Sequence, residues 1–259
     1  MIAAGCDIGA LTAKAAIMRD GELVGTEIIP VKPDAVRSAT EVMGRLLGRL
    51  GLSFDDIDYC VSTGYGRRII PFADTNISEI SCHARGAWWL VPSIRTVLDA
   101  GGQDCKAIRV GDKGELKDFR MNMKCAAGTG KSLEIMAEAL GVGITELGEL
   151  ALQASEPVSL KNQCCILTEI TIRRLILEGR TEADVAAGIC NHTAKYIAAL
   201  VQDMGARNDI GFTGGIAKNA GVVTSLEHIL KTELVEFPVD PQLIGAIGAA
   251  LFAAEMGKA

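Results

Sequence analysis

One short pattern occurs twice in this sequence, and it limits the folds that the chain can adopt. The segments CDIGALTAK and LDAGGQDCK both read D-x-G-x-x-x-x-K, with the fixed positions at Asp7, Gly9, Lys14, Asp99, Gly101 and Lys106. Apolar runs precede and follow each copy, so each copy predicts a β-hairpin with a glycine in its turn. Two such hairpins favour a duplicated fold with a cleft between its halves.

The residue types in this pattern suit the binding of phosphate groups. Glycine lets backbone N–H groups approach a phosphate closely, and an aspartate at a strand end can hold Mg²⁺ through water molecules. The hydroxyl of Thr12 and the ammonium of Lys14 can contact phosphate oxygens. A pair of ordinary hairpins with acidic strand ends is the alternative, and a single copy would favour it. The repeat favours phosphate binding.

A third glycine-rich segment is IGFTGGIAKNAGV at 210–222. Apolar residues lead into Thr213, Gly214 and Gly215, and a helix is expected to begin near Lys218. Such a turn can admit a flat ligand against its backbone. The later segment PQLIGAIGAALFAAEM predicts a helix of small residues that packs closely against its neighbours.

Together these elements resemble the superfamily of actin, the sugar kinases and the 70-kDa heat-shock ATPases. The resemblance implies an α/β fold of two ribonuclease-H-like (actin-like ATPase) subdomains around a nucleotide cleft that holds ATP and Mg²⁺. We expect subdomain I at residues 1–93 plus 241–259, and subdomain II at residues 94–240.

The overall composition excludes several other classes of protein. The formal net charge of −6 argues against a nucleic-acid partner. No run of 18 uncharged apolar residues occurs, so we expect no membrane span, and the first residues lack the pattern of a signal peptide. We therefore expect a cytoplasmic protein, in which the eight cysteines are not structural disulfides.

Two cysteine positions precede predicted helices. Cys125 comes just before a Gly-Thr-Gly turn and a helix that starts near Thr129, and Cys164-Cys165 open a helix through Glu178. A helix N-terminus lowers the pKa of a thiol and favours the thiolate as a metal ligand. A 4Fe–4S cluster normally takes four thiolates, which two chains related by a two-fold axis could supply at two each. Inert buried thiols are the alternative, and spacing alone favours them.

The order of five segments gives a more specific resemblance. The segments STGYGR, SEISCHARGA, DAGGQDCK, KCAAGTGK and TGGIAKNAGV follow one another along nearly the whole chain. They look like the activator ATPases of 2-hydroxyacyl-CoA dehydratases, a family of the BadF/BadG/BcrA/BcrD type that includes the ATPase subunits of benzoyl-CoA reductase. The resemblance implies an oxygen-sensitive homodimer with one shared 4Fe–4S cluster. It also implies that ATP hydrolysis drives single electrons from ferredoxin or flavodoxin into a dehydratase- or reductase-type iron–sulfur enzyme.

The resemblance also implies roles for individual residues. Cys125 matches the family's first cluster ligand. Cys164 matches the second, because the family's second cysteine lies five residues before a glutamate, here Glu169. The adjacent Cys165 leaves the choice between Cys164 and Cys165 open. Gln103 is the candidate for orienting the attacking water, with Asp7 and Asp104 as further catalytic residues and Asp7 as the Mg²⁺ ligand. The nucleotide-binding positions implied are Gly9, Leu11, Thr12, Ala13, Lys14, Asp99, Gly101, Gly102, Gln103, Gly128, Thr129, Gly214, Gly215, Asn219 and Gln242.

Other residues are assigned no chemistry. His83 is interpreted as a buried, hydrogen-bonded histidine on a helix, and Cys6, Cys60, Cys105 and Cys190 as core residues. A cluster-free small-molecule kinase of the same superfamily is the alternative function, although such kinases are usually longer than this chain. A nucleotide-binding regulatory module without redox activity is a second alternative. The acceptor enzyme is not identified by the sequence.

Overall fold

The computed structural model describes residues 1–122, 128–161 and 164–258. Two compact units divide the chain, one made of Met1–Val97, Ile108–Asp118 and Phe237–Ala259, and the other of Leu98–Ala107 and Phe119–Glu236. We call them unit 1 and unit 2 and describe each by itself. The expected subdomain boundaries at 93/94 and 240/241 stay a prediction.

Unit 1 is built on a five-stranded sheet with the strand order β3-β2-β1-β4-β5. Strands β1 (Ile2–Ile8), β2 (Thr12–Arg19) and β3 (Glu22–Pro30) form an antiparallel meander. Strand β4 (Tyr59–Thr63) runs parallel to β1, and the short β5 (Thr75–Asn76) runs parallel to β4. The first expected hairpin is therefore confirmed, because β1 and β2 pair in register from Ile2↔Arg19 to Ile8↔Ala13.

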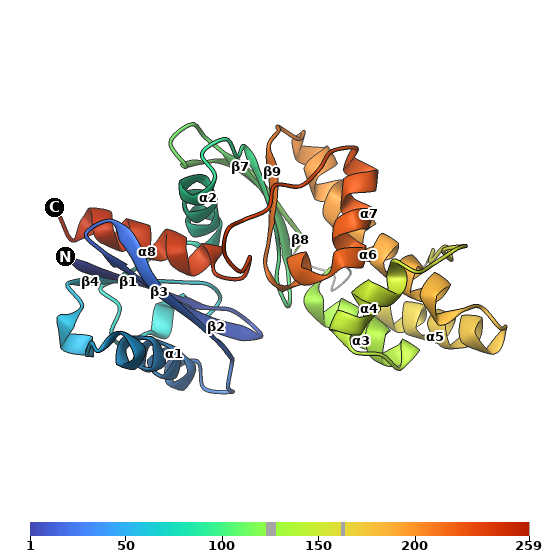
Figure 1. The fold of residues 1–259 in the computed structure, drawn as a ribbon, viewed down its shortest axis with the longest axis horizontal. Helices are drawn as coiled ribbons and strands as arrows, with labels where there is room; N and C mark the ends of the chain where they lie inside the picture. Colours follow the sequence, from blue (N-terminus) through green and yellow to red (C-terminus); the bar gives the residue numbers. More distant parts are fainter. Residues whose placement is uncertain (123–127, 162–163, 259) are drawn as a thin grey trace. The chain divides into compact units, whose positions relative to one another are not determined.

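Helices cover both faces of this sheet (Figure 1). Side chains alternate between the two faces of a strand, so Ala4, Cys6 and Ile8 pack with α1 (Ala35–Leu50), whereas Ala3 packs with α8 (Ile244–Met256). Helix α2 (Glu79–Leu90) packs against α8. Two short 3₁₀ helices, η1 (Phe54–Asp56) and η2 (Arg67–Ile69), complete the unit.

Unit 2 contains most of a four-stranded sheet with the strand order β8-β7-β6-β9. The strands are β6 (Thr96–Ala100), β7 (Cys105–Val110), β8 (Leu116–Asn122) and β9 (Ile210–Thr213). Strands β6 and β7 are neighbours joined by the turn at 101–104, which confirms the second expected hairpin. The 3₁₀ helix η3 (Gly215–Lys218) follows β9.

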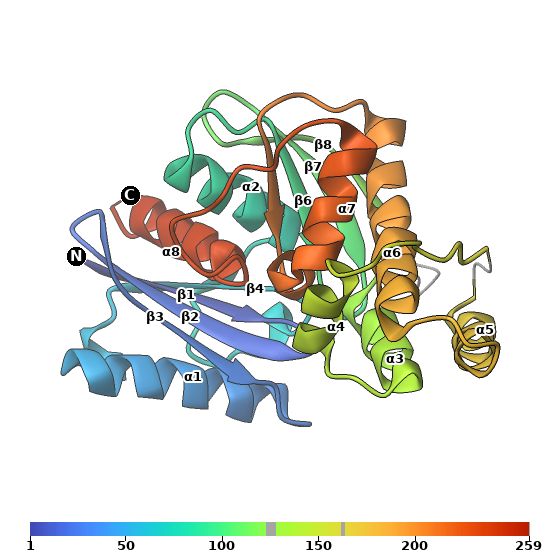
Figure 2. The same cartoon turned by 45° about the vertical axis from the view of Figure 1, so that its right-hand side comes forward.

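The helices of unit 2 are α3 (Gly130–Leu140), α4 (Ile144–Ala151), α5 (Cys165–Leu177), α6 (Glu182–Met204) and α7 (Ala220–Leu230). Figure 2 shows α6 and α7 side by side next to the four-stranded sheet, and their apolar residues join those of β6 and β7 in one core. Among the described residues, no helix has the length and apolar character needed to cross a membrane.

The helices expected from periodicity are found where the sequence placed them. One small difference concerns the helix expected near Lys218, because a 3₁₀ turn occupies Gly215–Lys218 and α7 begins at Ala220. The side chain of Asn219 accepts a hydrogen bond from the amide of Val222 at 3.0 Å, so it acts as the N-cap that fixes this start.

Candidate functional site

The first glycine turn places a lysine ammonium beside its backbone. The Gly9 amide donates to the Thr12 carbonyl at 3.0 Å, and the pairing Asp7↔Lys14 lies just before this turn. Lys14 Nζ is 3.1 Å from Asp7 Oδ2, and both side chains are largely buried. A Cβ atom on Gly9 would lie 3.1 Å from Lys14 Nζ, so the ammonium sits directly at the turn. A phosphate bound at this turn would meet a fixed positive charge.

The Asp7 carboxylate is enclosed by two glycines from distant parts of unit 1. A Cβ atom on Gly64, in the STGYGR segment, would collide with Asp7 Oδ1, and one on Gly245, in α8, would lie 3.0 Å from Asp7 Oδ2. Gly64 has φ +83°, a conformation that side chains other than glycine rarely adopt. The backbones of the two glycines thus pack closely against the two carboxylate oxygens. A carboxylate at a strand end is the type of group that could hold a Mg²⁺ ion through waters.

Gln242 approaches the same turn from the C-terminal part of unit 1. Its Nε2 donates to the Thr12 hydroxyl at 3.4 Å, although 230 residues separate the two positions in the chain. The family resemblance implies that Gln242 binds nucleotide. In the structure its amide lies at the first turn, next to the hydroxyl expected to contact phosphate.

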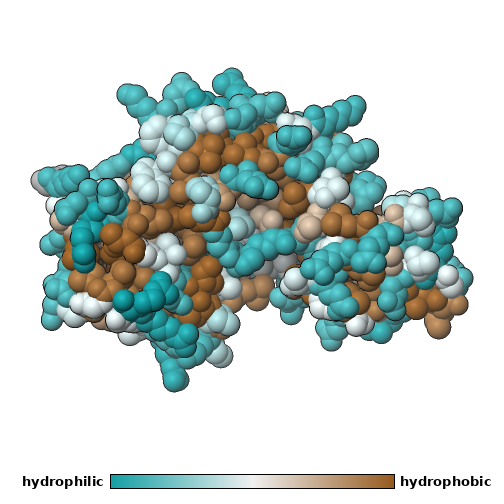
Figure 3. All heavy atoms as spheres, viewed as in Figure 1, coloured by the Kyte–Doolittle hydropathy of each residue, from teal (hydrophilic) through white to brown (hydrophobic). Residues whose placement is uncertain are grey.

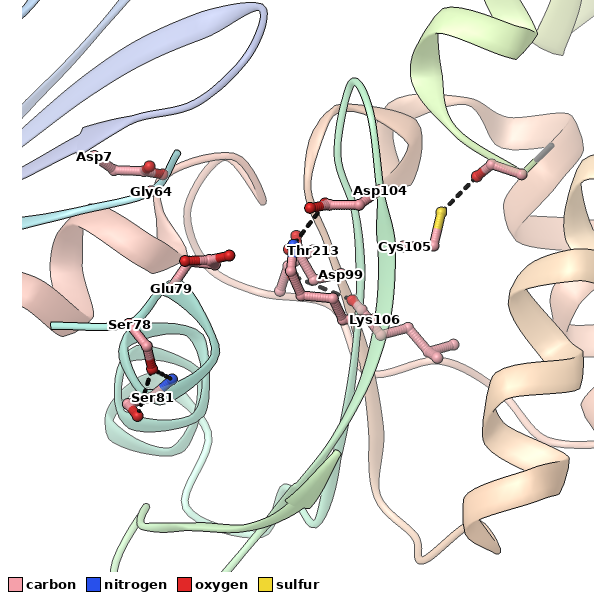
Figure 4. Close-up of polar contacts among 12 residues, drawn as sticks. Asp7, Gly64, Ser78, Glu79, Ser81, Asp99, Asp104, Cys105, Lys106 and Thr213 are labelled. Carbon is pink, nitrogen blue, oxygen red and sulfur yellow. Dashed lines mark hydrogen bonds and ion pairs between the residues drawn. The ribbon is translucent and has the colours of Figure 1, made fainter. Parts of the chain in front are cut away.

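The second glycine turn carries a larger ionic cluster (Figure 4). The Gly101 amide donates to the Asp104 carbonyl at 3.0 Å, which matches the bond across the first turn. Lys106 Nζ lies 3.4 Å from Asp99 Oδ2 and 2.6 Å from Asp104 Oδ1. Lys106 and Asp99 are buried, whereas the Asp104 side chain keeps 32% of its surface exposed.

The two turns therefore differ in the charge that they present. Asp104 occupies the repeat position that Thr12 occupies in the first turn, and its carboxylate holds Lys106. A Cβ atom on Gly101 would lie 3.4 Å from Asp104 Oδ1, so a carboxylate stands where the first turn has an ammonium. The exposed tip residue also changes, from Leu11 to Gln103. The first turn suits an anion, and the second suits a cation or a water molecule.

The T-G-G turn after β9 lies against Asp99. The hydroxyl of Thr213 is 3.1 Å from both Asp99 Oδ1 and the Leu98 carbonyl oxygen. Gly214 has φ +87°, and a Cβ atom there would collide with the Ala100 carbonyl oxygen. Gly215 is exposed. The turn thus follows the end of β6 closely and leaves backbone of Gly215 open to solvent.

The second turn is also hydrogen-bonded to the start of α3. The amides of Gly130 and Lys131 donate to the carbonyls of Gly101 and Gly102, each at 2.9 Å. The Cys105 thiol donates to the Gly128 carbonyl oxygen. Thr129 is fully buried, and its hydroxyl accepts from the Ser132 amide at 3.4 Å. Gly128 and Thr129, both implied nucleotide-binding positions, thus hold the helix start against the turn.

Asn219, an implied nucleotide-binding position, has several partners inside unit 2. Its Oδ1 accepts from the Val222 amide and from the Cys190 thiol, and its Nδ2 donates to the Ile144 carbonyl at 3.0 Å. The residue is buried. These bonds give Asn219 a structural role as a helix cap, and its contact with a nucleotide stays a prediction.

One of the expected cluster cysteines can be described. Cys164 is the exposed N-cap residue of α5, and Cys165 is partly exposed. The Cys164 carbonyl accepts bonds from the amide and the hydroxyl of Thr168, each at 3.0 Å, and no hydrogen bond caps the helix through its thiol. Cys125 lies outside the described residues. An exposed thiol at a helix N-terminus fits one ligand of a cluster whose remaining ligands come from elsewhere.

The other cysteines are unsuited to ligation. Burial raises the pKa of Cys60, Cys82 and Cys190 to about 12, and raises those of Cys6 and Cys105 as well. These groups stay protonated near neutral pH, so the expectation that Cys6, Cys60, Cys105 and Cys190 are core residues is confirmed. Within the described ranges, no three His, Cys, Asp or Glu side chains gather as a complete metal site.

Three residues near these turns were not assigned a role from the sequence. Lys106 could have been found, because it is the last position of the repeat. Gly64 and Gly245 carry no local signal, since only the packing of three distant segments brings them to Asp7. The roles implied for the remaining site residues stay predictions.

Comparison with known proteins agrees with these features. Residues 4–253 match the model of the BadF/BadG/BcrA/BcrD ATPase family. The chain is 41% identical over its whole length to an activator of lactoyl-CoA dehydratase from Anaerotignum propionicum, of which it covers 99%. Component A of (R)-2-hydroxyglutaryl-CoA dehydratase from Acidaminococcus fermentans superposes with a TM-score of 0.96 at 34% identity, with all of both chains covered. The activator of 2-hydroxyisocaproyl-CoA dehydratase from Clostridium difficile, solved with bound ADPNP, gives 0.94 at 37% identity over all of this chain and 96% of that one.

Proposed function

This chain belongs to the BadF/BadG/BcrA/BcrD ATPase family, and on that premise we propose that it is an ATP-dependent activator of a partner iron–sulfur enzyme. In this proposal it hydrolyses ATP and delivers single low-potential electrons, received from ferredoxin or flavodoxin, to a 2-hydroxyacyl-CoA dehydratase or a related reductase. Relatives named as dehydratase activators support the acceptor class. The proposed location is the cytoplasm.

The first turn is proposed to bind phosphate groups of ATP. Lys14 offers a fixed ammonium, and Gly9 offers backbone without a side chain. Gln242 and Thr12 extend the same surface with an amide and a hydroxyl. A related activator bound to ADPNP supports the choice of nucleotide.

Hydrolysis is proposed to depend on positioning rather than on a covalent intermediate. Gln103, exposed at the tip of the second turn, orients the attacking water, and Asp104 beside it can accept a hydrogen bond from that water. Asp7, which lies against Gly64 and Gly245, would hold Mg²⁺ through its waters. When bound, Mg²⁺ neutralises charge that develops on the transferred phosphate.

The observation that carries the coupling between ATP and electron transfer is the bonding of the second turn to α3. Two backbone hydrogen bonds of 2.9 Å join Gly101 and Gly102 to the first amides of this helix. A displacement of the Gln103 turn therefore displaces the chain that immediately follows the proposed ligand Cys125 in sequence. Different contacts of this turn with ATP and ADP would bias the chain between two arrangements.

A shared 4Fe–4S cluster in a homodimer is proposed, with Cys125 and Cys164 from each chain as ligands. When bound, the cluster supplies one-electron chemistry at low potential. Support comes from helix α5, which follows its exposed N-cap residue Cys164 and exposes four large apolar side chains: Ile166, Leu167, Ile170 and Leu177. Apolar atoms reach the surface in this region (Figure 3). A second copy of the chain would remove this surface from water.

Anoxic purification tests the proposal. We expect a brown dimer with about two iron atoms per chain, because one 4Fe–4S cluster serves two chains. Cys125→Ala and Cys164→Ala should lose the iron, whereas Cys165→Ala should keep it and serves as the matched control. A colourless monomer that phosphorylates a sugar or a carboxylic acid would contradict the proposal and favour a small-molecule kinase. A colourless protein that binds ATP without turnover would favour a regulatory module.

A further inference from the structure

We propose that His83 is a positioning residue for Asp7. Its imidazole orients the Asp7 carboxylate at the point where both side chains approach Gly245. The inference rests on the proposed function, because Asp7 matters as the residue that holds the waters of Mg²⁺. It concerns only unit 1, in which all three residues lie. The sequence gives His83 no role beyond that of a buried histidine.

The packing of two helices brings His83 to Asp7. Helix α2 carries His83 and contacts α8 through glycines at which no side chain would fit. A Cβ atom on Gly86 would collide with the carbonyl oxygen of Ile244. A Cβ atom on Gly248 would collide with the carbonyl oxygen of Cys82. The two helix backbones therefore touch on both sides of His83 in sequence. This close approach of the two helices fixes how near the imidazole of His83 lies to Gly245.

The imidazole of His83 and the carboxylate of Asp7 both approach Gly245, which has no side chain to separate them. An ideal Cβ atom on Gly245 would lie 2.9 Å from His83 Nε2 and 3.0 Å from Asp7 Oδ2. Both residues are buried, with 5% of their surface exposed. The two polar atoms thus approach the same point beside the Cα atom of Gly245.

Asp7 needs such a partner because its other contacts fix only part of its orientation. Lys14 Nζ is 3.1 Å from Oδ2, while Oδ1 lies against the backbone of Gly64. An ammonium alone attracts the carboxylate but does not set the plane of its two oxygens. A second, directional group on the Oδ2 side would fix that plane, and with it the orientation in which the carboxylate could hold the waters of a bound metal.

Metal binding distinguishes this role from a purely structural one. Mn²⁺, used in place of Mg²⁺, is titrated by electron paramagnetic resonance into anoxic protein saturated with a non-hydrolysable ATP analogue. We expect His83→Ala to weaken Mn²⁺ binding about tenfold or more, as is usual when a partner of a metal ligand is removed. Binding of the nucleotide without metal should not change. His83→Gln carries an amide near the position of Nε2 and should restore part of the Mn²⁺ affinity.

Two further variants keep the inference testable. His192→Asn is the matched control, because His192 is equally buried but lies in α6 with its Nδ1 at the Leu160 carbonyl; Mn²⁺ affinity should stay normal. Gly245→Ala removes neither polar group, but it places a methyl group 2.9 Å from His83 Nε2 and 3.0 Å from Asp7 Oδ2. It should therefore weaken Mn²⁺ binding as His83→Ala does. It decides the question if His83→Ala does not fold.

The results separate failure of this inference from failure of the proposed function. If the unsubstituted chain binds Mn²⁺ and nucleotide, but folded His83→Ala and Gly245→Ala bind Mn²⁺ equally well, His83 does not position Asp7. If the unsubstituted chain binds no Mn²⁺ together with nucleotide, the proposed function fails, and the inference fails with it.

Discussion

Lys14 and Asp7 form a buried ion pair across the first hairpin, with 3.1 Å between Nζ and Oδ2. Their side chains keep only 11% and 6% of their surfaces exposed. Such a pair is costly to break, because removal of one partner leaves the other charge buried without compensation. The pair is therefore both a structural feature of the sheet and the proposed source of positive charge for phosphate.

Lys14→Met should lower the free energy of unfolding by about 3 kcal/mol and weaken ATP binding. The loss of stability follows from the uncompensated carboxylate of Asp7, and the loss of affinity from the missing ammonium. Chemical denaturation and nucleotide titration measure the two effects. Lys117→Met is the control, since its pair with Glu115 is exposed and should contribute almost nothing. Equal effects of both substitutions would contradict the assigned role of Lys14.

Gln103→Ala should reduce the rate of ATP hydrolysis by at least about 100-fold while leaving ATP affinity nearly unchanged. Gln103 is exposed at the tip of its turn, so its loss removes a water-orienting group and no core packing. Steady-state kinetics and equilibrium binding separate the two quantities. Gln153→Ala, at another exposed glutamine, should have no effect. A variant with a normal rate would remove Gln103 from the mechanism.

Ile170→Glu should weaken the proposed dimer about tenfold or more, because a carboxylate would be buried at an apolar contact. Ile170 is 61% exposed on α5 in the single chain. Light scattering after size-exclusion chromatography gives the oligomeric state at several concentrations. Leu152→Glu is the matched control, since Leu152 is 55% exposed at the end of α4. A fully dimeric Ile170→Glu would place the interface elsewhere.

His192 should make the protein less stable as the pH falls below about 6.5. Burial lowers the pKa of His192 from its ordinary value of 6.5, and the Leu160 carbonyl only partly offsets this. Between the folded and unfolded pKa values, the unfolded chain binds more protons. The stabilisation is therefore present above pH 6.5 and is lost as the pH falls through the folded pKa.

Denaturation of His192→Asn at several pH values tests this dependence. The variant should lose less stability than the parent chain between about pH 7.5 and 5.5. His228→Asn, at an exposed histidine, should behave like the parent chain. An unchanged slope in His192→Asn would show that other groups cause the acid sensitivity.

The sequence predicted the hairpins because their signal is local. Each copy of the repeat contains the strand end, the turn glycine and the lysine opposite, and the turns at 9–12 and 101–104 follow directly. The helices at 130–140, 165–177 and 182–204 were equally predictable from apolar periodicity. Local signals of this kind do not require knowledge of the tertiary packing.

The surroundings of Asp7 could not be predicted in this way. Gly64, His83 and Gly245 come from three separate segments, and none is marked by spacing or by a residue type that requires a ligand. The difference between the turns is visible in the sequence as Thr12 against Asp104. Its consequence is not visible, because only the structure brings the Asp104 carboxylate to Lys106 and the Thr12 hydroxyl to Gln242.

An activation assay tests the central claim most directly. The chain is reduced by ferredoxin or flavodoxin without oxygen and mixed with a 2-hydroxyacyl-CoA dehydratase, and dehydration of the acyl-CoA is followed. The account predicts that dehydration starts only when Mg²⁺ and hydrolysable ATP are added, and that neither a non-hydrolysable analogue nor Gln103→Ala supports it. Full activation without ATP, or ATP consumption with no activation of any dehydratase or reductase, would contradict it.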